Sequence, residues 1–71
     1  MQISARNVLK GKVLSVKHGT VNSEVTLEIA KGVKVVAMVT KDSAENLALK
    51  KGKVAYAIIK ASSVMVGVDH D

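Results

Sequence analysis

Two short segments, Ser4-Ala5-Arg6-Asn7 and Lys60-Ala61-Ser62-Ser63, carry the residue types with the clearest capacity for chemistry in this sequence. Each combines a cation with hydroxyl groups, and neither contains Asp or Glu. A tetrahedral oxyanion requires positive charge, hydrogen-bond donors from several directions and no carboxylate nearby. The residue types therefore favour oxyanion binding, with a serine that caps a turn as the alternative at either segment.

No set of residues in the sequence has the spacing of a catalytic site. A Walker-type glycine loop and a nucleophile elbow are both missing. Glu24 and Glu28 have a spacing typical of a solvated strand face, and His18 adjoins a turn glycine. Cysteine is absent, and two histidines are too few for a structural zinc site. We therefore expect a protein that is not an enzyme and has no directly coordinated metal.

The first half of the chain predicts three strands. Residues 8–17 mix apolar and basic side chains around Gly11, which indicates a bend, and residues 18–22 form a turn. Residues 24–29 alternate strictly between polar and apolar, which is typical of a half-buried strand. A Lys-Gly turn then leads into a third strand over residues 33–40.

The second half predicts a short helix and two more strands. Asp42 with Glu45 three residues later has the form of a helix N-cap, and Gly52 lies just past the helix end. Strands follow at residues 54–60 and 64–68. The predicted fold is all-β with one short helix, a five-stranded OB-fold-like β-barrel, in which the helix plugs one end. An open meander packed on a helix has the same element order.

The length predicts a single domain, residues 1–71, with a marginal core. A chain of this size buries only ~60% of the surface that its unfolded form exposes, and here no disulfide can add stability. Valine, with thirteen residues, is the most frequent apolar type, and the strands at 33–40 and 54–60 are apolar on both faces. Since a small barrel buries only its inner face, we expect a homo-oligomer to cover the outer one.

The net charge of +5 favours an anionic partner, either nucleic acid, an acidic membrane surface or a small anion. Single-strand binding on a barrel of this type depends on stacking of bases on aromatic rings, and Tyr56 is the one aromatic residue. We therefore expect no nucleic acid and no membrane partner. Residues 1–4 lack an apolar signal core, which predicts a cytoplasmic location. A nucleic-acid-binding module and a purely structural oligomerisation module remain alternatives.

Four motifs in order resemble those of the molbindin, or Mop, domain family. The opening motif of that family is similar to Ser4-Ala5-Arg6-Asn7 followed by Leu9-Lys10-Gly11. Its second motif is similar to Lys17-His18-Gly19-Thr20-Val21-Asn22-Ser23-Glu24-Val25. Thr40-Lys41-Asp42-Ser43 resembles the third motif and Lys60-Ala61-Ser62-Ser63-Val64-Met65-Val66-Gly67-Val68 the fourth. The resemblance runs over nearly the whole chain.

This resemblance implies a five-stranded OB-type fold that binds molybdate, and usually tungstate, in the cytoplasm. It implies assembly as a hexamer, a trimer of dimers, with the oxyanions held at subunit interfaces. A copy without attached DNA-binding or ATPase parts implies a role in molybdenum storage or homeostasis. A pterin, after which the family was first named, is a minor alternative ligand.

The resemblance also assigns two classes of oxyanion site. The interface site would use residues of one chain and two hydroxyls from a neighbour: Ser4, Arg6, Lys60, Ala61 and Ser62, with Thr40 and Ser43. The second class, on symmetry axes, would use the turn formed by His18, Gly19, Thr20, Val21 and Asn22. This chain has His18 and Thr20 where many relatives carry an acidic residue and Ala, so the donors of the second class are less defined.

Overall fold

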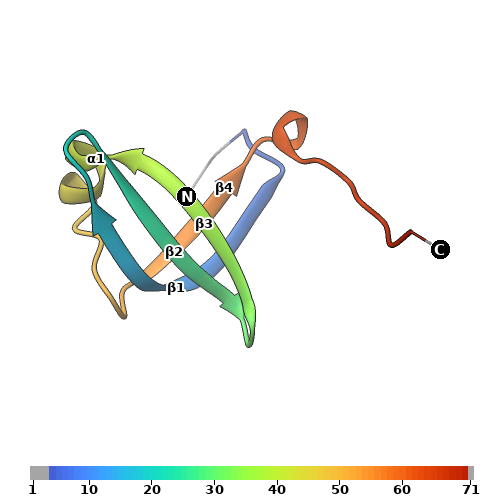
Figure 1. Ribbon diagram of the computed structural model, residues 1–71, viewed down its shortest axis with the longest axis horizontal. Helices are drawn as coiled ribbons and strands as arrows, with labels where there is room; N and C mark the ends of the chain where they lie inside the picture. The colour runs from blue at the N-terminus through green and yellow to red at the C-terminus, as the bar shows by residue number, and fades with distance from the viewer. Residues whose placement is uncertain (1–3, 71) are drawn as a thin grey trace.

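The structure, a computed structural model, describes residues 4–70. Asp71, the last residue of the C-terminal segment, and residues 1–3 lie outside the described part. The fold is mostly β with one short helix, and its strands form one curled antiparallel sheet in the order β3-β2-β1-β4 (Figure 1). The elements are β1 (Asn7–His18), β2 (Asn22–Ala30), β3 (Val33–Thr40), α1 (Lys41–Asn46), β4 (Val54–Ile59) and the 3₁₀ turn η1 (Ala61–Ser63).

The core lies on the concave face of this sheet. Alternation in β2 directs Val25 and Leu27 inward, as the sequence predicts, and their cross-strand partners in β1 are Val16 and Val13. Val13, Val25, Leu27 and Ala57 form the buried cluster. No helix within residues 4–70 has the length and apolarity to cross a membrane. The core is small, as expected for a chain of this length.

Gly11 is required where β1 bends between β2 and β4. A Cβ atom at this position would lie 2.5 Å from the carbonyl oxygen of Glu28 and 2.9 Å from Cδ1 of Ile29. Because the oxygen belongs to the backbone of the paired strand, relief would require β2 to move. Gly11 therefore permits a close approach of two backbones.

We expect Gly11→Ala to destabilise the fold by about 1–3 kcal/mol, since overpacking against backbone forces strands apart. Urea unfolding followed by circular dichroism measures this change as a lower midpoint. Lys10→Ala is the matched control, because this neighbouring residue of β1 is exposed. Equal midpoints for the two variants would contradict the steric role of Gly11.

The helix begins and ends earlier than the sequence pattern predicts. Thr40, not Asp42, is the N-cap: its backbone is extended, and its Oγ1 accepts a hydrogen bond from the N–H of Ser43 at 3.0 Å. The last residue of β3 thus caps the helix directly. The helix ends at Asn46, and Ala48 adopts a left-handed conformation with φ of 51°. That conformation stops the helix well before Gly52, which was expected to follow its last residue.

The predicted fifth strand does not form within the chain. After β4, the N–H of Ser63 donates to the carbonyl of Lys60 at 2.9 Å, and η1 turns the chain away from the sheet. Residues 64–70, here called the C-terminal arm, extend outward without a ladder partner (Figure 1). Met65, Val66 and Val68 are each more than 90% exposed. The local sequence pattern predicts a strand for these residues, but it does not show which strand they would pair with.

Without that strand, the sheet remains an open half-barrel with a groove between its edge strands, β3 and β4. The groove has a volume of about 350 Å³. Its lining is apolar apart from Lys53, and the residues are Val25, Leu27, Ala37, Val39, Leu47, Leu49, Lys53, Val54, Ala55, Tyr56 and Ile58. One chain therefore exposes both an apolar groove and an apolar arm.

Candidate oxyanion site

Strand pairing brings the two chemically promising segments of the sequence together. The last pair of the β1–β4 ladder is Asn7 with Ile59, and the side-chain amide of Asn7 donates to the carbonyl of Ile59 at 3.2 Å. Arg6 precedes this pair and Lys60 follows it, so both lie where the ladder ends. The register of one antiparallel ladder thus positions residues from opposite ends of the chain.

These segments surround one open cavity of about 490 Å³. Its lining consists of Ser4, Ala5, Arg6, Ile58, Lys60, Ala61 and Ser62. Every residue that the resemblance assigns to this chain's half of the interface site therefore lines the cavity. Ile58 was not predicted to line this cavity. It lies on the same face of the sheet as its cross-strand partner, Val8.

The cavity is strongly suited to an anion. Arg6 and Lys60 supply two positive charges, and no carboxylate lines the cavity. Within residues 4–70, the N–H groups of Ala61 and Ser62 donate no backbone hydrogen bond. Like charges placed together repel one another, and a bound dianion would neutralise both. The cavity thus offers an anion positive charge, hydroxyl groups and backbone amides at the protein surface.

Thr40 and Ser43 lie elsewhere in the chain. They belong to the junction of β3 and α1, whereas the Arg6–Lys60 cavity adjoins η1 at the other end of the sheet (Figure 1). The hydroxyl of Thr40 donates to Oγ of Ser43 at 2.8 Å. That bond leaves the Ser43 hydroxyl proton available to a ligand. One chain does not bring these two hydroxyls to the cavity, so a site that includes them needs a second chain.

The turn predicted as the second site class also borders a cavity, of about 480 Å³. Its residues His18, Gly19, Thr20, Val21 and Asn22 all line this cavity. His18 is the last residue of β1 and not part of the turn itself. Lys17, Glu24 and Met38 line the cavity as well. Sequence reasoning missed these three because they come from the outer face of three paired strands, as the register shows.

Neither cavity has the residues of a metal centre or of an acid–base catalyst. Among residues 4–70, no three His, Asp or Glu side chains gather closely enough to hold a metal ion. The donors around Arg6 and Lys60 are instead those that bind oxygen atoms carrying negative charge. The residues around Arg6 and Lys60 are thus a candidate small-anion site, with its donors where the β1–β4 ladder ends.

The comparison with protein families agrees with this class. The model of the TOBE domain matches residues 3–66. The chain therefore belongs to the TOBE domain family.

Its relatives include small proteins of the same length. Molybdenum-pterin-binding protein 3 of Clostridium pasteurianum is 53% identical over 66 residues, which cover 93% of this chain and 97% of that protein. MopII from Clostridium pasteurianum, solved in an apo form, is 46% identical with a TM-score of 0.88, covering 94% of this chain and 100% of that chain. These matches confirm the resemblance to the Mop proteins.

A further solved structure is that of the cytoplasmic molybdate-binding protein ModG with molybdate bound. It is 46% identical and has a TM-score of 0.92, and the match covers 97% of this chain and 49% of that chain. The fold described above is therefore one on which a relative holds molybdate.

Proposed function

We propose that this protein binds molybdate as an intact oxyanion and serves molybdenum storage or homeostasis in the cytoplasm, without catalysing a reaction. The observation that carries the proposal is the pair of cations, Arg6 and Lys60, in a cavity that no carboxylate lines. The molybdate-bound structure of ModG, described as cytoplasmic, and the molybdenum-pterin-binding relatives support the choice of anion and location.

The donor set fits a tetrahedral dianion. The two cations match its charge, while Ser4, Ser62 and the amides of Ala61 and Ser62 approach its oxygens from different directions. Tungstate has nearly the same size and charge, so the same donors bind it. The cavity offers no aromatic ring on which a pterin could stack, and we therefore assign it to the oxyanion.

The complete site needs at least two chains. In our proposal, Thr40 and Ser43 of a neighbouring copy close the cavity around Arg6 and Lys60, as the resemblance implies. The turn at residues 18–22 forms a second site class where copies meet on a symmetry axis. The assembly we propose is the hexamer, a trimer of dimers.

The exposed arm and the open groove supply a physical route to this assembly. The free edges of β3 and β4 can accept one further strand, and the arm is an unpaired apolar segment. An arm from one copy seated in the groove of another would complete a five-stranded, OB-type barrel in each. Because the arm follows residues 60–63 directly, the same exchange would carry the cavity toward the neighbouring chain.

Titration calorimetry tests the function. We expect sodium molybdate and sodium tungstate to bind the assembled protein saturably, and sodium sulfate to bind more weakly because it is smaller. If neither molybdate nor tungstate gives saturable heat, the protein is a purely structural oligomerisation module and the proposed function is wrong.

Arg6 is expected to contribute strongly to binding. Arg6→Ala should weaken molybdate binding by ~1.5–3 kcal/mol, the range for a charge-assisted donor, and leave the assembly intact. Arg6→Lys keeps the charge but loses the planar pair of donors, so it should recover only part of the affinity. Calorimetry measures both variants, and sedimentation verifies their size. Unchanged affinity in a folded Arg6→Ala assembly would refute this role.

A further inference from the structure

A buried hydroxyl holds the ring of His18 where β1 ends beside the turn. His18 pairs with Ser23 across β1 and β2, and its Nδ1 lies 2.7 Å from Oγ of Ser23. Ser23 is fully buried, with 0% exposure, whereas His18 reaches the surface and lines the turn cavity. Within residues 4–70, Nε2 of the ring makes no hydrogen bond. The ring is therefore oriented by one nitrogen while the other is available to a ligand.

This contact is compatible with both charge states of the imidazole. In the neutral ring, the hydroxyl of Ser23 donates to Nδ1 when the proton lies on Nε2, and Nδ1 donates to Oγ of Ser23 when the proton lies on Nδ1. In the protonated ring, Nδ1 donates to Oγ of Ser23 and Nε2 keeps its proton. Nε2 is thus a donor in the protonated ring and in the neutral tautomer that carries its proton on Nε2. Protonation adds a positive charge without any need for the ring to move.

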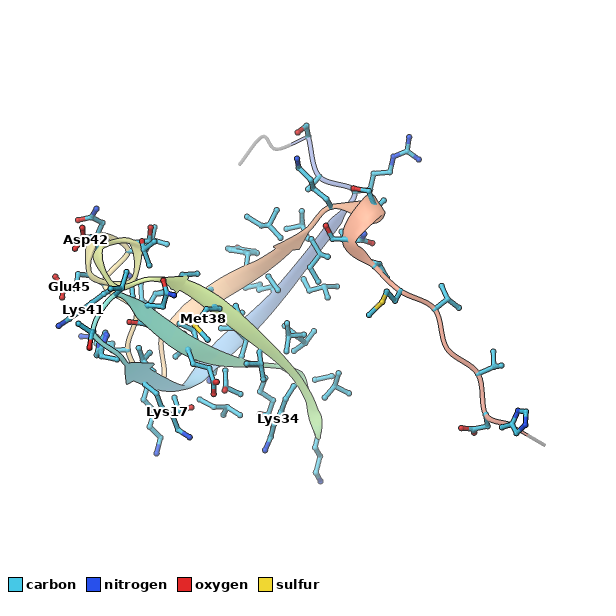
Figure 2. The ribbon with its side chains drawn as sticks, turned by 45° about the horizontal axis from the view of Figure 1, so that its top comes forward. Lys17, Lys34, Met38, Lys41, Asp42 and Glu45 are labelled. Carbon is cyan, nitrogen blue, oxygen red and sulfur yellow. The ribbon has the colours of Figure 1, made fainter. Side chains whose placement is uncertain are left out.

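The surroundings of the turn lack the positive charge that marks the other cavity. The turn is tied to α1 by a hydrogen bond from the N–H of Lys41 to the carbonyl of Val21, at 2.8 Å. Lys17 and Glu24 line the turn cavity, and the helix bonded to the turn, α1, carries Lys41, Asp42 and Glu45 (Figure 2). These five side chains carry three negative and two positive charges, so they provide no net positive charge. A protonated His18 would change this balance.

We infer that His18 supplies the positive charge of the turn site, so that an oxyanion binds there with uptake of a proton by His18. The N–H groups of Thr20 and Val21, which donate no backbone hydrogen bond within residues 4–70, complete the donors. The inference rests on the proposed function and deepens it. The two site classes then differ in pH dependence: the Arg6–Lys60 site keeps its charge, and the turn site gains affinity as pH falls.

The test isolates the turn site in a Ser62→Glu background, in which a carboxylate occupies the other cavity and sedimentation verifies the assembly. Calorimetry with sodium molybdate in two buffers of different ionisation enthalpy counts the protons taken up. His18→Asn keeps a group that can bond to Ser23 but cannot titrate, and His70→Asn is the matched control. We expect proton uptake in the background protein and in His70→Asn, and none in His18→Asn. Affinity should fall as pH rises from about 6 to 8 in the background protein and stay unchanged in His18→Asn.

Ser23→Ala separates the positioning of the ring from its charge. It should weaken binding at the lower pH, because the ring then turns freely, while some proton uptake persists. Binding without proton uptake, or no binding in the Ser62→Glu background when the wild type binds, overturns the inference and leaves the proposed function standing. No molybdate binding by the wild type at either pH overturns both.

Discussion

A chain that ends after Ser63 is expected to lose the assembly and most of its stability. The truncation removes the C-terminal arm, whose side chains Met65, Val66 and Val68 are almost fully exposed in one chain. Burial in a partner's groove stabilises by about 1.5–3 kcal/mol for each such side chain, before the entropy of ordering the arm is subtracted. Analytical ultracentrifugation at micromolar concentration should show a species of several chains for the full protein and a monomer for the truncated one.

Two further variants separate the arm's apolar contacts from its length. A chain that ends after Val68 removes only the polar tail and should assemble normally. Val66→Asp keeps the length but places a charge in the apolar groove, so it should disrupt the assembly. A full-length protein that sediments as a compact, stable monomer would contradict the exchange of arms. So would a truncated chain that keeps the size of the full assembly.

Ser62→Glu is expected to reduce molybdate binding at the interface site by more than a hundredfold. The substitution places a carboxylate in the cavity that holds Arg6 and Lys60. Two unit charges 4 Å apart near a protein surface interact by about 4 kcal/mol, and the repulsion of a dianion is larger still. Calorimetry should therefore lose the heat that belongs to this site class.

Ser62→Gln is the matched control for this substitution. It has the size of Glu without the charge, so it tests whether bulk alone closes the cavity. We expect Gln to weaken binding much less than Glu does. Equal losses of molybdate affinity in the two variants would show that the size of the side chain, and not its charge, blocks the cavity. Unchanged binding in Ser62→Glu would show that the anion binds elsewhere.

Local patterns in the sequence predicted most of the sheet. The alternation of residues 24–29 identified β2 and its inward side chains, Val25 and Leu27, because a half-buried strand must repeat every two residues. The helix cap was wrong because Asp42 and Thr40 are both good caps, and only the end of β3 decides between them. The fifth strand does not form within one chain, because strand character does not specify a partner.

The residues of the candidate oxyanion site could be predicted from the sequence where they are cations or hydroxyls without a nearby carboxylate. Ser4, Arg6, Lys60 and Ser62 stood out as cations and hydroxyls without nearby acid, and the β1–β4 register then placed them around one cavity. Cross-strand neighbours such as Glu24 and Met38, which line the turn cavity, depend on the register of three strands. Spacing along the chain does not reveal that register.

Thermal melting of the wild-type protein in sodium molybdate against sodium chloride at matched ionic strength tests oxyanion binding most directly. An anion that binds the assembled state stabilises it by mass action, by ~2.7 kcal/mol per site at a hundredfold excess over its dissociation constant. Screening of the +5 chain by salt acts equally in both solutions. We predict a clearly higher Tm in molybdate. Equal Tm values in the two salts would contradict the account and leave a structural module.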